Sequence, residues 1–213
     1  MARGLGVTLV ISVFSALIGT VLGFGLCMLR LKKNVFGNIA GAFIKLIQGT
    51  PMLVLLMLLY YVIFAKTGLA AITVAIIAFS INFSVYVSEM MRSGIQAVDP
   101  GQTEGALAIG YTRSESFFKV VFPQAARHFL PVIKGEFISL VKTTSVVGYI
   151  TIEDLTKASD IIRSRTYDAF FPLIVTAIIY FFSAWRMTLA LERIEIRLDP
   201  KRRKNVLKGV KQL

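Results

Sequence analysis

The chain has 213 residues, of which 55% are hydrophobic and only 17% are charged, and its mean hydropathy is +0.70. Soluble domains carry about 25% charged residues, so this composition excludes an ordinary soluble globular domain. The formal net charge is +12, which in a soluble protein would suggest a nucleic-acid partner. Here the charges lie between apolar segments and at the C-terminus, which favours a membrane surface and no nucleic acid. The single cysteine, Cys27, excludes an intrachain disulfide.

Five segments are apolar enough to cross a bilayer as helices. Residues 5–29, 46–65 and 67–88 contain no charged residue, and each reaches the roughly 20 residues that a crossing needs. Residues 169–185 are also uncharged, whereas the segment 129–152 contains Lys134, Glu136 and Lys142. We therefore predict an all-α integral membrane protein, one domain over residues 1–213, with five transmembrane helices at about residues 5–30, 43–65, 67–90, 129–152 and 168–190.

The basic residues predict the orientation of these spans. Segments after the first, third and fifth spans are rich in lysine and arginine, and the two others are poor in them or offset by acidic residues. Basic segments stay on the cytoplasmic side of a membrane. The N-terminus is therefore predicted outside and the basic tail from Arg186 onward inside, as an odd number of spans requires.

Within the spans, small and polar residues indicate packing. Gly19 and Gly23 form a pair of small residues that lets another helix approach closely. Pro51 either starts a helix or kinks the second span, and a functional hinge there is an open alternative. Asn82 lies deep in the third span, where a polar side chain either bonds a neighbouring helix or lines a cavity.

The segment of residues 99–123 reads as a pair of short cytoplasmic helices. Asp99, Pro100 and Gly101 predict a turn, residues 102–109 a short helix, and Gly110 its end. Thr112 and Glu115 have the spacing of a capping box, which opens a second helix through Val121 that Pro123 is predicted to close. By periodicity alone this is an ordinary amphipathic hairpin at the membrane surface.

Several motifs, taken together, resemble one family of transport proteins. The stretch Glu104-Gly-Ala-Leu-Ala-Ile-Gly110, followed by Phe122-Pro-Gln-Ala125, resembles the EAA loop of ATP-binding-cassette (ABC) importer permeases. Residues 89–104 and Gln48-Gly-Thr-Pro-Met52 resemble the polar amino acid branch of that family, so the resemblance covers nearly the whole chain. The family's Glu-Ala-Ala reads Glu-Gly-Ala here, its Arg before Gly-Thr-Pro is Gln48, and its Lys-Asp-Thr-Ser reads Lys-Thr-Thr-Ser at residues 142–145.

The resemblance implies a subunit rather than a complete machine. It implies two permease subunits, identical or paralogous, two ATPase subunits that bind ATP and Mg, and an extracytoplasmic binding protein in a bacterial or archaeal inner membrane. The chain itself has no Gly-x-x-x-x-Gly-Lys-Ser/Thr stretch, so we expect no cofactor in it, no metal site and no enzyme activity of its own. The predicted ATPase-coupling residues are Glu104, Gly105, Ala106, Gly110, Tyr111 and Ser114.

Two other classes of function are possible from the residues alone. A secondary transporter driven by an ion gradient would usually show internal repeats and acidic residues within its membrane spans. The sequence shows no internal repeat, and the uncharged spans contain no aspartate or glutamate. A membrane anchor without transport activity would use the basic tail to bind anionic lipid.

The substrate is predicted from the outer end of the fourth span. Glu153 and Asp154 fall where that helix leaves the hydrocarbon, and a carboxylate there would pair with a guanidinium or ammonium group. The alternative is that both are cap or loop residues paired with Lys157. We expect uptake of polar amino acids, with arginine, lysine or histidine first and glutamine next. The predicted substrate-pathway residues, besides these two carboxylates, are Asn82, Tyr86, Thr143, Thr144 and Ser145, the last three two to three turns deeper on the same helix.

Overall fold

The computed structural model describes residues 1–32 and 34–198, and within these residues every regular element is a helix. Most of the basic tail lies outside the described residues. The elements, in chain order, are α1 (Ala2–Leu31), α2 (Val35–Gln48), α3 (Met52–Leu58), η1 (Leu59–Ile63), α4 (Ala71–Gln96), α5 (Pro100–Ala108), α6 (Arg113–Glu115), η2 (Ser116–Val121), α7 (Phe122–Thr143), η3 (Thr144–Ile150), α8 (Leu155–Thr166) and α9 (Phe170–Leu198).

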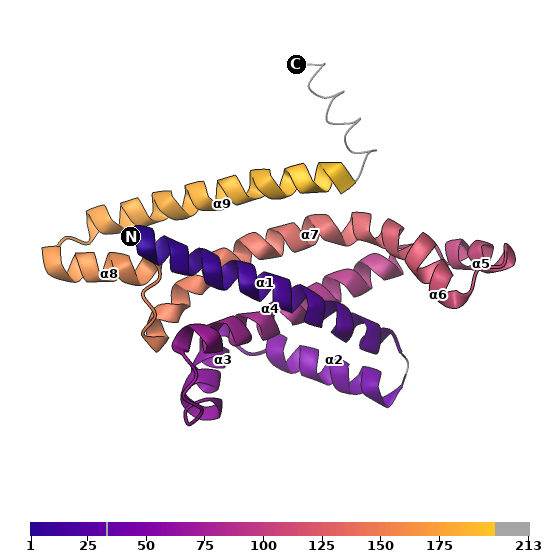
Figure 1. Ribbon diagram of the computed structural model, residues 1–213, viewed down its shortest axis with the longest axis horizontal. Helices are drawn as coiled ribbons and strands as arrows, with labels where there is room; N and C mark the ends of the chain where they lie inside the picture. The colour runs from indigo at the N-terminus through magenta and orange to yellow at the C-terminus, as the bar shows by residue number, and fades with distance from the viewer. Residues whose placement is uncertain (33, 199–213) are drawn as a thin grey trace, which may run out of the picture.

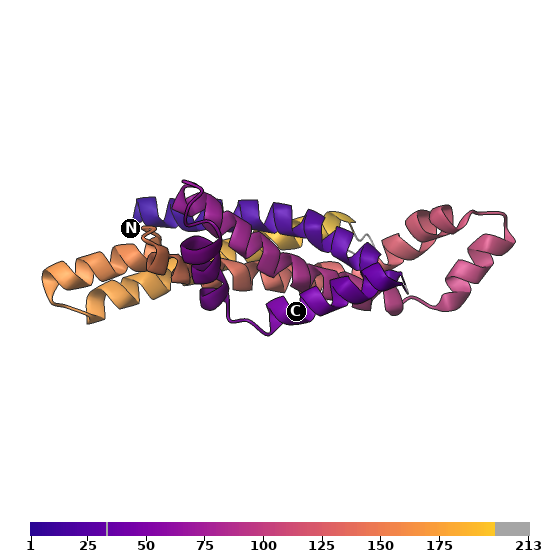
Figure 2. The same ribbon diagram turned by 90° about the horizontal axis from the view of Figure 1, so that it is seen from below.

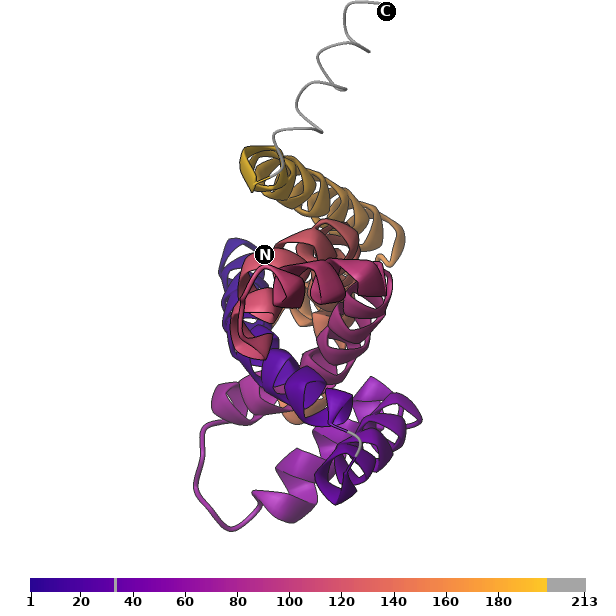
Figure 3. The same cartoon turned by 90° about the vertical axis from the view of Figure 1, so that its right-hand side faces the viewer.

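Four long helices run along the longest axis of the molecule. Figure 1 shows α1, α4, α7 and α9 in this direction, with the hairpin of α5 and α6 projecting at one end and α8 at the other. Figure 2 shows the same two projections from below. Viewed along the axis, α1, α4 and α7 form the centre, while α9 and α2 lie on opposite sides of it (Figure 3). The N-terminus lies at the α8 end, away from the hairpin.

The centre of the bundle is the contact of α1 with α4. Gly19 and Gly23 are buried there. A Cβ added at Gly19 would lie 2.9 Å from the Ser80 carbonyl oxygen, and one added at Gly23 would lie 2.7 Å from the Ser84 carbonyl oxygen. Two helices can come this close only where one of them lacks a side chain. The Ser15 hydroxyl also donates to the Ile76 carbonyl, at 3.2 Å. The predicted packing role of the two glycines is confirmed.

The second predicted span, 43–65, is wrong as a single helix. The chain forms α2 and then α3 continued by η1, and these two parts are bent by 105°. Gly49 ends α2, and Pro51 precedes α3 with an extended ψ of 137°. A proline has no N–H to continue the helix and pushes Thr50 before it out of the α region. Pro51 therefore has both predicted roles, since it directly precedes the start of α3 and lies at the break where the two parts are bent by 105°.

The fourth predicted span, 129–152, is also not one helix. The α-helix α7 begins earlier, at Phe122, and ends at Thr143, where the 3₁₀ helix η3 follows. Thr151 then adopts a left-handed φ of 66°, and a further helix, α8, begins after Asp154. The third span is α4, shifted to Ala71–Gln96.

Length and composition let three of the described helices cross a membrane. These are α1, α4 and α9 up to Arg193, and the bent pair of α2 with α3 and η1 is a fourth if it counts as one span. The helix α7 lies beside them but carries the charges noted above. The all-helical membrane class is therefore confirmed, while a total of five spans stays a prediction.

Two alanine substitutions on α1 test the close approach. We expect Gly23→Ala to lower the free energy of unfolding by about 1–3 kcal/mol, because the added Cβ overpacks against a backbone carbonyl that cannot move away. Gly25→Ala is the matched control, since a Cβ there meets nothing within 4 Å. Thermal unfolding in detergent micelles measures both. Equal melting temperatures of the two variants would contradict the packing role of Gly23.

Candidate functional site

The hairpin at one end of the bundle is built by local hydrogen bonds. The Asp99 carboxylate accepts from the Gly101 N–H at 2.6 Å, so the predicted turn is the start of α5, with Pro100 in its first turn. At the other end of α5, Gly110 has a φ of +94°, and its N–H donates to Leu107 at 3.0 Å. The Tyr111 N–H donates to Ala106 at 3.1 Å. This pattern is a Schellman motif, which needs a residue such as glycine in the left-handed region.

The second half of the hairpin begins with the predicted capping box. Thr112 donates its N–H to the Glu115 carboxylate at 3.1 Å, and Glu115 returns its N–H to the Thr112 hydroxyl at 3.2 Å. The Lys119 ammonium group donates to the same carboxylate at 2.8 Å. The Lys119 and Thr112 donors hold the pKa of Glu115 at about 2, so the carboxylate is ionised at neutral pH.

Pro123 does not close this helix, contrary to the prediction. The chain passes through the π-helix η2, where the Phe122 N–H bonds back to Phe117, and continues directly into α7. The wider π turn shifts the hydrogen-bond register just before the residue that has no N–H to donate. The hairpin and α7 therefore form one continuous helical element.

The predicted coupling residues are placed unequally on the hairpin. Glu104, Gly105, Gly110 and Ser114 are exposed and Tyr111 is half-buried, with the Lys119 ammonium 5.2 Å from the centre of its ring. Ala106 is only 4% exposed, so it packs inside the hairpin and does not present itself to a partner.

Sequence reasoning missed the apolar tip of the hairpin. Ile109 is 75% exposed beside Gly110, and Phe118 is 54% exposed on the second arm. An isoleucine directly before the helix-ending glycine was the available signal. The Gln124 side-chain amide donates to the Gln102 amide oxygen at 2.9 Å, which links the first arm to α7.

A polar face runs along α4 and α7. The exposed stripe of α7 has helical spacing and consists of His128, Val132, Gly135, Ser139 and Lys142. The exposed parts of α1 and α9 are instead rich in phenylalanine, leucine, isoleucine and valine. Val132 is the one large apolar residue among these five, and a mainly polar and small face of a membrane helix is typical of one that lies away from lipid.

The corresponding stripe of α4 contains two predicted pathway residues. Asn82 and Tyr86 are half-buried and share a face with Glu89 and Ser93. The two stripes meet in a groove of about 400 Å³, whose lining includes Glu89, Ser93, His128 and Val132. Glu136 is half-buried next to the stripe of α7, and sequence reasoning noted its charge without giving it a role.

The three predicted hydroxyl residues lie at the junction of α7 and η3. The Thr143 hydroxyl donates to the Ser139 carbonyl at 2.9 Å, and the buried Thr144 hydroxyl donates to Val141 at 2.7 Å. Ser145 is half-buried on η3. The prediction that these residues share one helix with the two carboxylates is wrong, because α7 ends at Thr143 and the 3₁₀ helix η3 and the left-handed Thr151 separate it from Glu153 and Asp154.

Glu153 and Asp154 are adjacent in sequence but differ in environment. Glu153 is exposed. Asp154 is fully buried and caps α8, since its carboxylate accepts from the N–H groups of Thr156 at 3.1 Å and Lys157 at 2.9 Å. The Tyr180 hydroxyl of α9 also donates to it, at 3.4 Å. Asp154 therefore holds α8 and α9 together, and only Glu153 is free to meet a solute.

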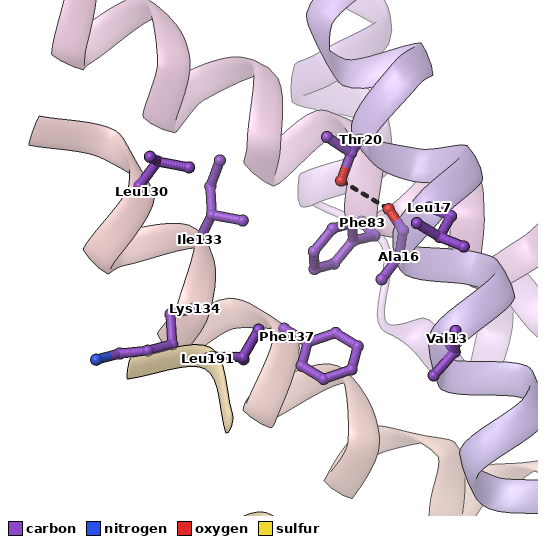
Figure 4. Close-up of a pocket in the computed structure, with 10 residues that line it drawn as sticks. All are labelled: Val13, Ala16, Leu17, Thr20, Phe83, Leu130, Ile133, Lys134, Phe137 and Leu191. Atoms are coloured by element: carbon purple, nitrogen blue, oxygen red, sulfur yellow. Dashed lines mark hydrogen bonds between the residues drawn. The ribbon is translucent and has the colours of Figure 1, made fainter. Parts of the chain in front are cut away.

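A separate cavity of about 310 Å³ lies between α1, α7 and α9. Figure 4 shows its lining, which is apolar apart from Thr20 and Lys134. The Thr20 hydroxyl donates to the Ala16 carbonyl at 2.7 Å, and the Lys134 ammonium pairs with Glu192 at 3.5 Å. Both polar groups are satisfied, so this cavity suits a hydrocarbon chain and does not suit the charged ends of an amino acid.

The sequence matches one family model over nearly its whole length. That model describes the "binding-protein-dependent transport system inner membrane component" and matches residues 7–204. The chain belongs to this family. It is therefore an inner-membrane permease subunit and not an enzyme, and it works with a separate ATPase. This membership decides against the ion-driven transporter and the simple anchor.

Individual relatives confirm the resemblance to amino acid permeases. The arginine transport system permease protein ArtQ of Bacillus subtilis is 32% identical, over 92% of this chain and 91% of its own. The L-cystine transport system permease protein TcyB of the same organism is 31% identical, over 93% and 86%. A crystal structure of an amino acid ABC transporter with histidines superposes with a TM-score of 0.83 at 37% identity, covering 92% of each chain.

The two neighbouring carboxylates give a matched test of the cap. Asp154→Ala should destabilise the first turn of α8 by about 0.5–2 kcal/mol, because two backbone N–H groups lose their acceptor. Hydrogen exchange at the amides of Thr156 and Lys157 should accelerate accordingly. Glu153→Ala removes a carboxylate that caps nothing and should leave these rates unchanged. Equal rates in both variants would show that Asp154 does not hold the helix.

Proposed function

We propose that this chain forms half of the translocation pathway for ATP-driven uptake of a polar, cationic amino acid. The observation that carries the proposal is the polar face of α4 and α7, which differs from the apolar outer faces of α1 and α9. Glycine, serine, histidine and charged side chains along one open face suit a solute that keeps hydrogen-bonding groups along its way. Asn82, Tyr86, Thr143 and Ser145 border this pathway in the proposal.

The open face also supports a second permease subunit. A pathway through the membrane must be closed from lipid on all sides, and one chain provides a single wall. In our proposal residues 1–213 form one domain that pairs with a second copy or a paralogue, and two ATPase subunits and an extracytoplasmic binding protein complete the transporter. Together these subunits would import their substrate into the cytoplasm.

We further propose that the N-terminus lies outside and the C-terminus in the cytoplasm. The N-terminus and the hairpin lie at opposite ends of the bundle, and the segments near the hairpin end carry many lysine and arginine residues. This orientation places the hairpin on the side where ATP is found.

The hairpin is the proposed docking surface for the ATPase, which would bind ATP and Mg itself. Its exposed residues Glu104, Gly105, Gly110 and Ser114, together with Ile109 at the tip, form the contact, and Tyr111 supports it. Ala106 contributes by packing. Because the hairpin continues into α7, movement of the ATPase reaches the pathway through a stiff helical element.

Gly110→Val tests the docking surface. A β-branched residue at a φ of +94° costs about 1–3 kcal/mol of local strain, so the hairpin should change shape and retain less ATPase in co-purification. Gly68→Val is the matched control, because Gly68 also has a positive φ, of +67°, but precedes α4 far from the hairpin. Full retention of the ATPase by Gly110→Val would show that the hairpin is not the coupling element.

Charge at the outer end supports a cationic substrate. Glu153 is exposed beyond η3 and is free of the capping role that occupies Asp154. A similar permease is named for arginine and a similar structure for its histidines, while another relative is named for L-cystine. We therefore propose arginine, lysine or histidine as the substrate, with glutamine as the next choice.

Glu153→Gln tests this assignment. In the assembled transporter with its binding protein, the arginine concentration for half-maximal ATPase stimulation should rise at least about tenfold, because a hydrogen bond to a charged group contributes roughly 1.5–3 kcal/mol. Asp168→Asn is the control, since it removes an exposed carboxylate at the start of α9 and keeps the acceptor for the Phe170 N–H. A wild-type transporter that ignores arginine and lysine but responds to glutamine would refute the cationic assignment.

A further inference from the structure

A basic groove lies outside the proposed pathway, where the end of α1 meets α2. It has a volume of about 580 Å³, and its lining includes Arg30, Lys32, Asn38 and Lys45. Figure 1 shows that this junction lies toward the hairpin end of the bundle. Gly37 lets α2 begin directly against α1, because a Cβ there would overlap the Lys32 carbonyl.

The charges in the groove are not balanced. Arg30 forms an ion pair with Glu89, and the same carboxylate also pairs with Arg92 at 2.8 Å. Within residues 1–32 and 34–198, the structure records no carboxylate partner for the ammonium groups of Lys32 or Lys45. The groove lining therefore carries Arg30, Lys32 and Lys45, whereas the carboxylate that pairs with Arg30, Glu89, lies outside that lining and is shared with Arg92. The groove therefore attracts an anion.

The neighbouring face of α2 indicates what kind of anion fits. Asn38, Gly41 and Lys45 follow one another at helical spacing along the groove. The adjacent face is apolar and exposed, with Phe36 at 67% and Ile39 at 60%. A soluble anion would use only the basic groove, whereas a phospholipid would use the groove and the apolar face together.

We propose that this groove binds the phosphate headgroup of an anionic phospholipid, whose acyl chains lie along the apolar face of α2. Basic pockets between helices on the cytoplasmic side are suited to such headgroups. The stems of Lys32 and Lys45 can follow the helix surface while their ammonium groups reach the phosphate. The lipid would stabilise the short helix α2, which ends at Gln48 and cannot cross the membrane alone.

The test measures lipid retained by the purified transporter, assembled with its ATPase, by native mass spectrometry. The probes are phosphatidylglycerol and phosphatidylcholine, added in mixed micelles. The wild-type transporter should retain phosphatidylglycerol in preference to phosphatidylcholine. In Lys32→Gln/Lys45→Gln this affinity should fall roughly 25-fold, since each lysine near an anionic headgroup contributes about fivefold.

Two further double variants keep the result interpretable. Lys32→Arg/Lys45→Arg retains both charges and should retain the lipid. Lys66→Gln/Arg165→Gln removes the same charge at exposed positions outside the groove and should also bind as the wild type does. Size-exclusion chromatography confirms assembly of each variant before lipid is added.

Three results would overturn the proposal. The first is equal retention of the two lipids by the wild type, and the second is unchanged affinity for phosphatidylglycerol in Lys32→Gln/Lys45→Gln. The third comes from adding inorganic phosphate in competition. If free phosphate displaces phosphatidylglycerol as effectively as added phosphatidylglycerol does, the groove binds a soluble anion and the apolar face of α2 plays no part.

Discussion

Backbone contact between α1 and α4 is the constraint on which the other parts of this bundle depend. At Gly19 and Gly23 the two helices are separated by less than a side chain. In a membrane no water is released when apolar helices associate, so close van der Waals contact must stabilise the pair. From this contact, α4 extends toward the hairpin at one end of the molecule, and α1 extends toward the cap of α8 at the other end. The position of each end therefore depends on how the two helices pack.

The contacts at the α8 end of the bundle illustrate how α1 extends that alignment. Gly4 packs against the Asp154 carbonyl, where a Cβ would lie 2.5 Å from the oxygen, and the Thr8 hydroxyl accepts from the Leu155 N–H at 3.4 Å. Asp154 in turn reaches Tyr180 of α9. Asp154 thus contacts α1 through its backbone carbonyl and α8 and α9 through its carboxylate, and its neighbour Glu153 is left exposed beside them.

Charge is distributed over the bundle according to the surroundings of each face. The faces of α1 and α9 that lie outward are apolar, and the Lys134 ammonium near them is paired with Glu192. The face of α4 and α7 carries polar and ionisable groups along its length, and the groove beside α2 concentrates cations near one end. In our proposals, lipid chains cover the first of these surfaces, the transported solute moves along the second, and lipid headgroups bind at the third.

The sequence by itself determined the features that depend on local chemistry. Uncharged stretches indicated membrane helices. Gly110 ended α5 because its Schellman turn needs a residue with a left-handed backbone conformation, which glycine adopts readily. Thr112 and Glu115 capped the next helix. Tertiary structure decided the rest. The continuation of the helix past Pro123 and the burial of Asp154 beside exposed Glu153 depend on neighbouring elements. Spacing along a chain cannot distinguish such outcomes, because helices distant in sequence determine which backbone groups and which side chains are covered.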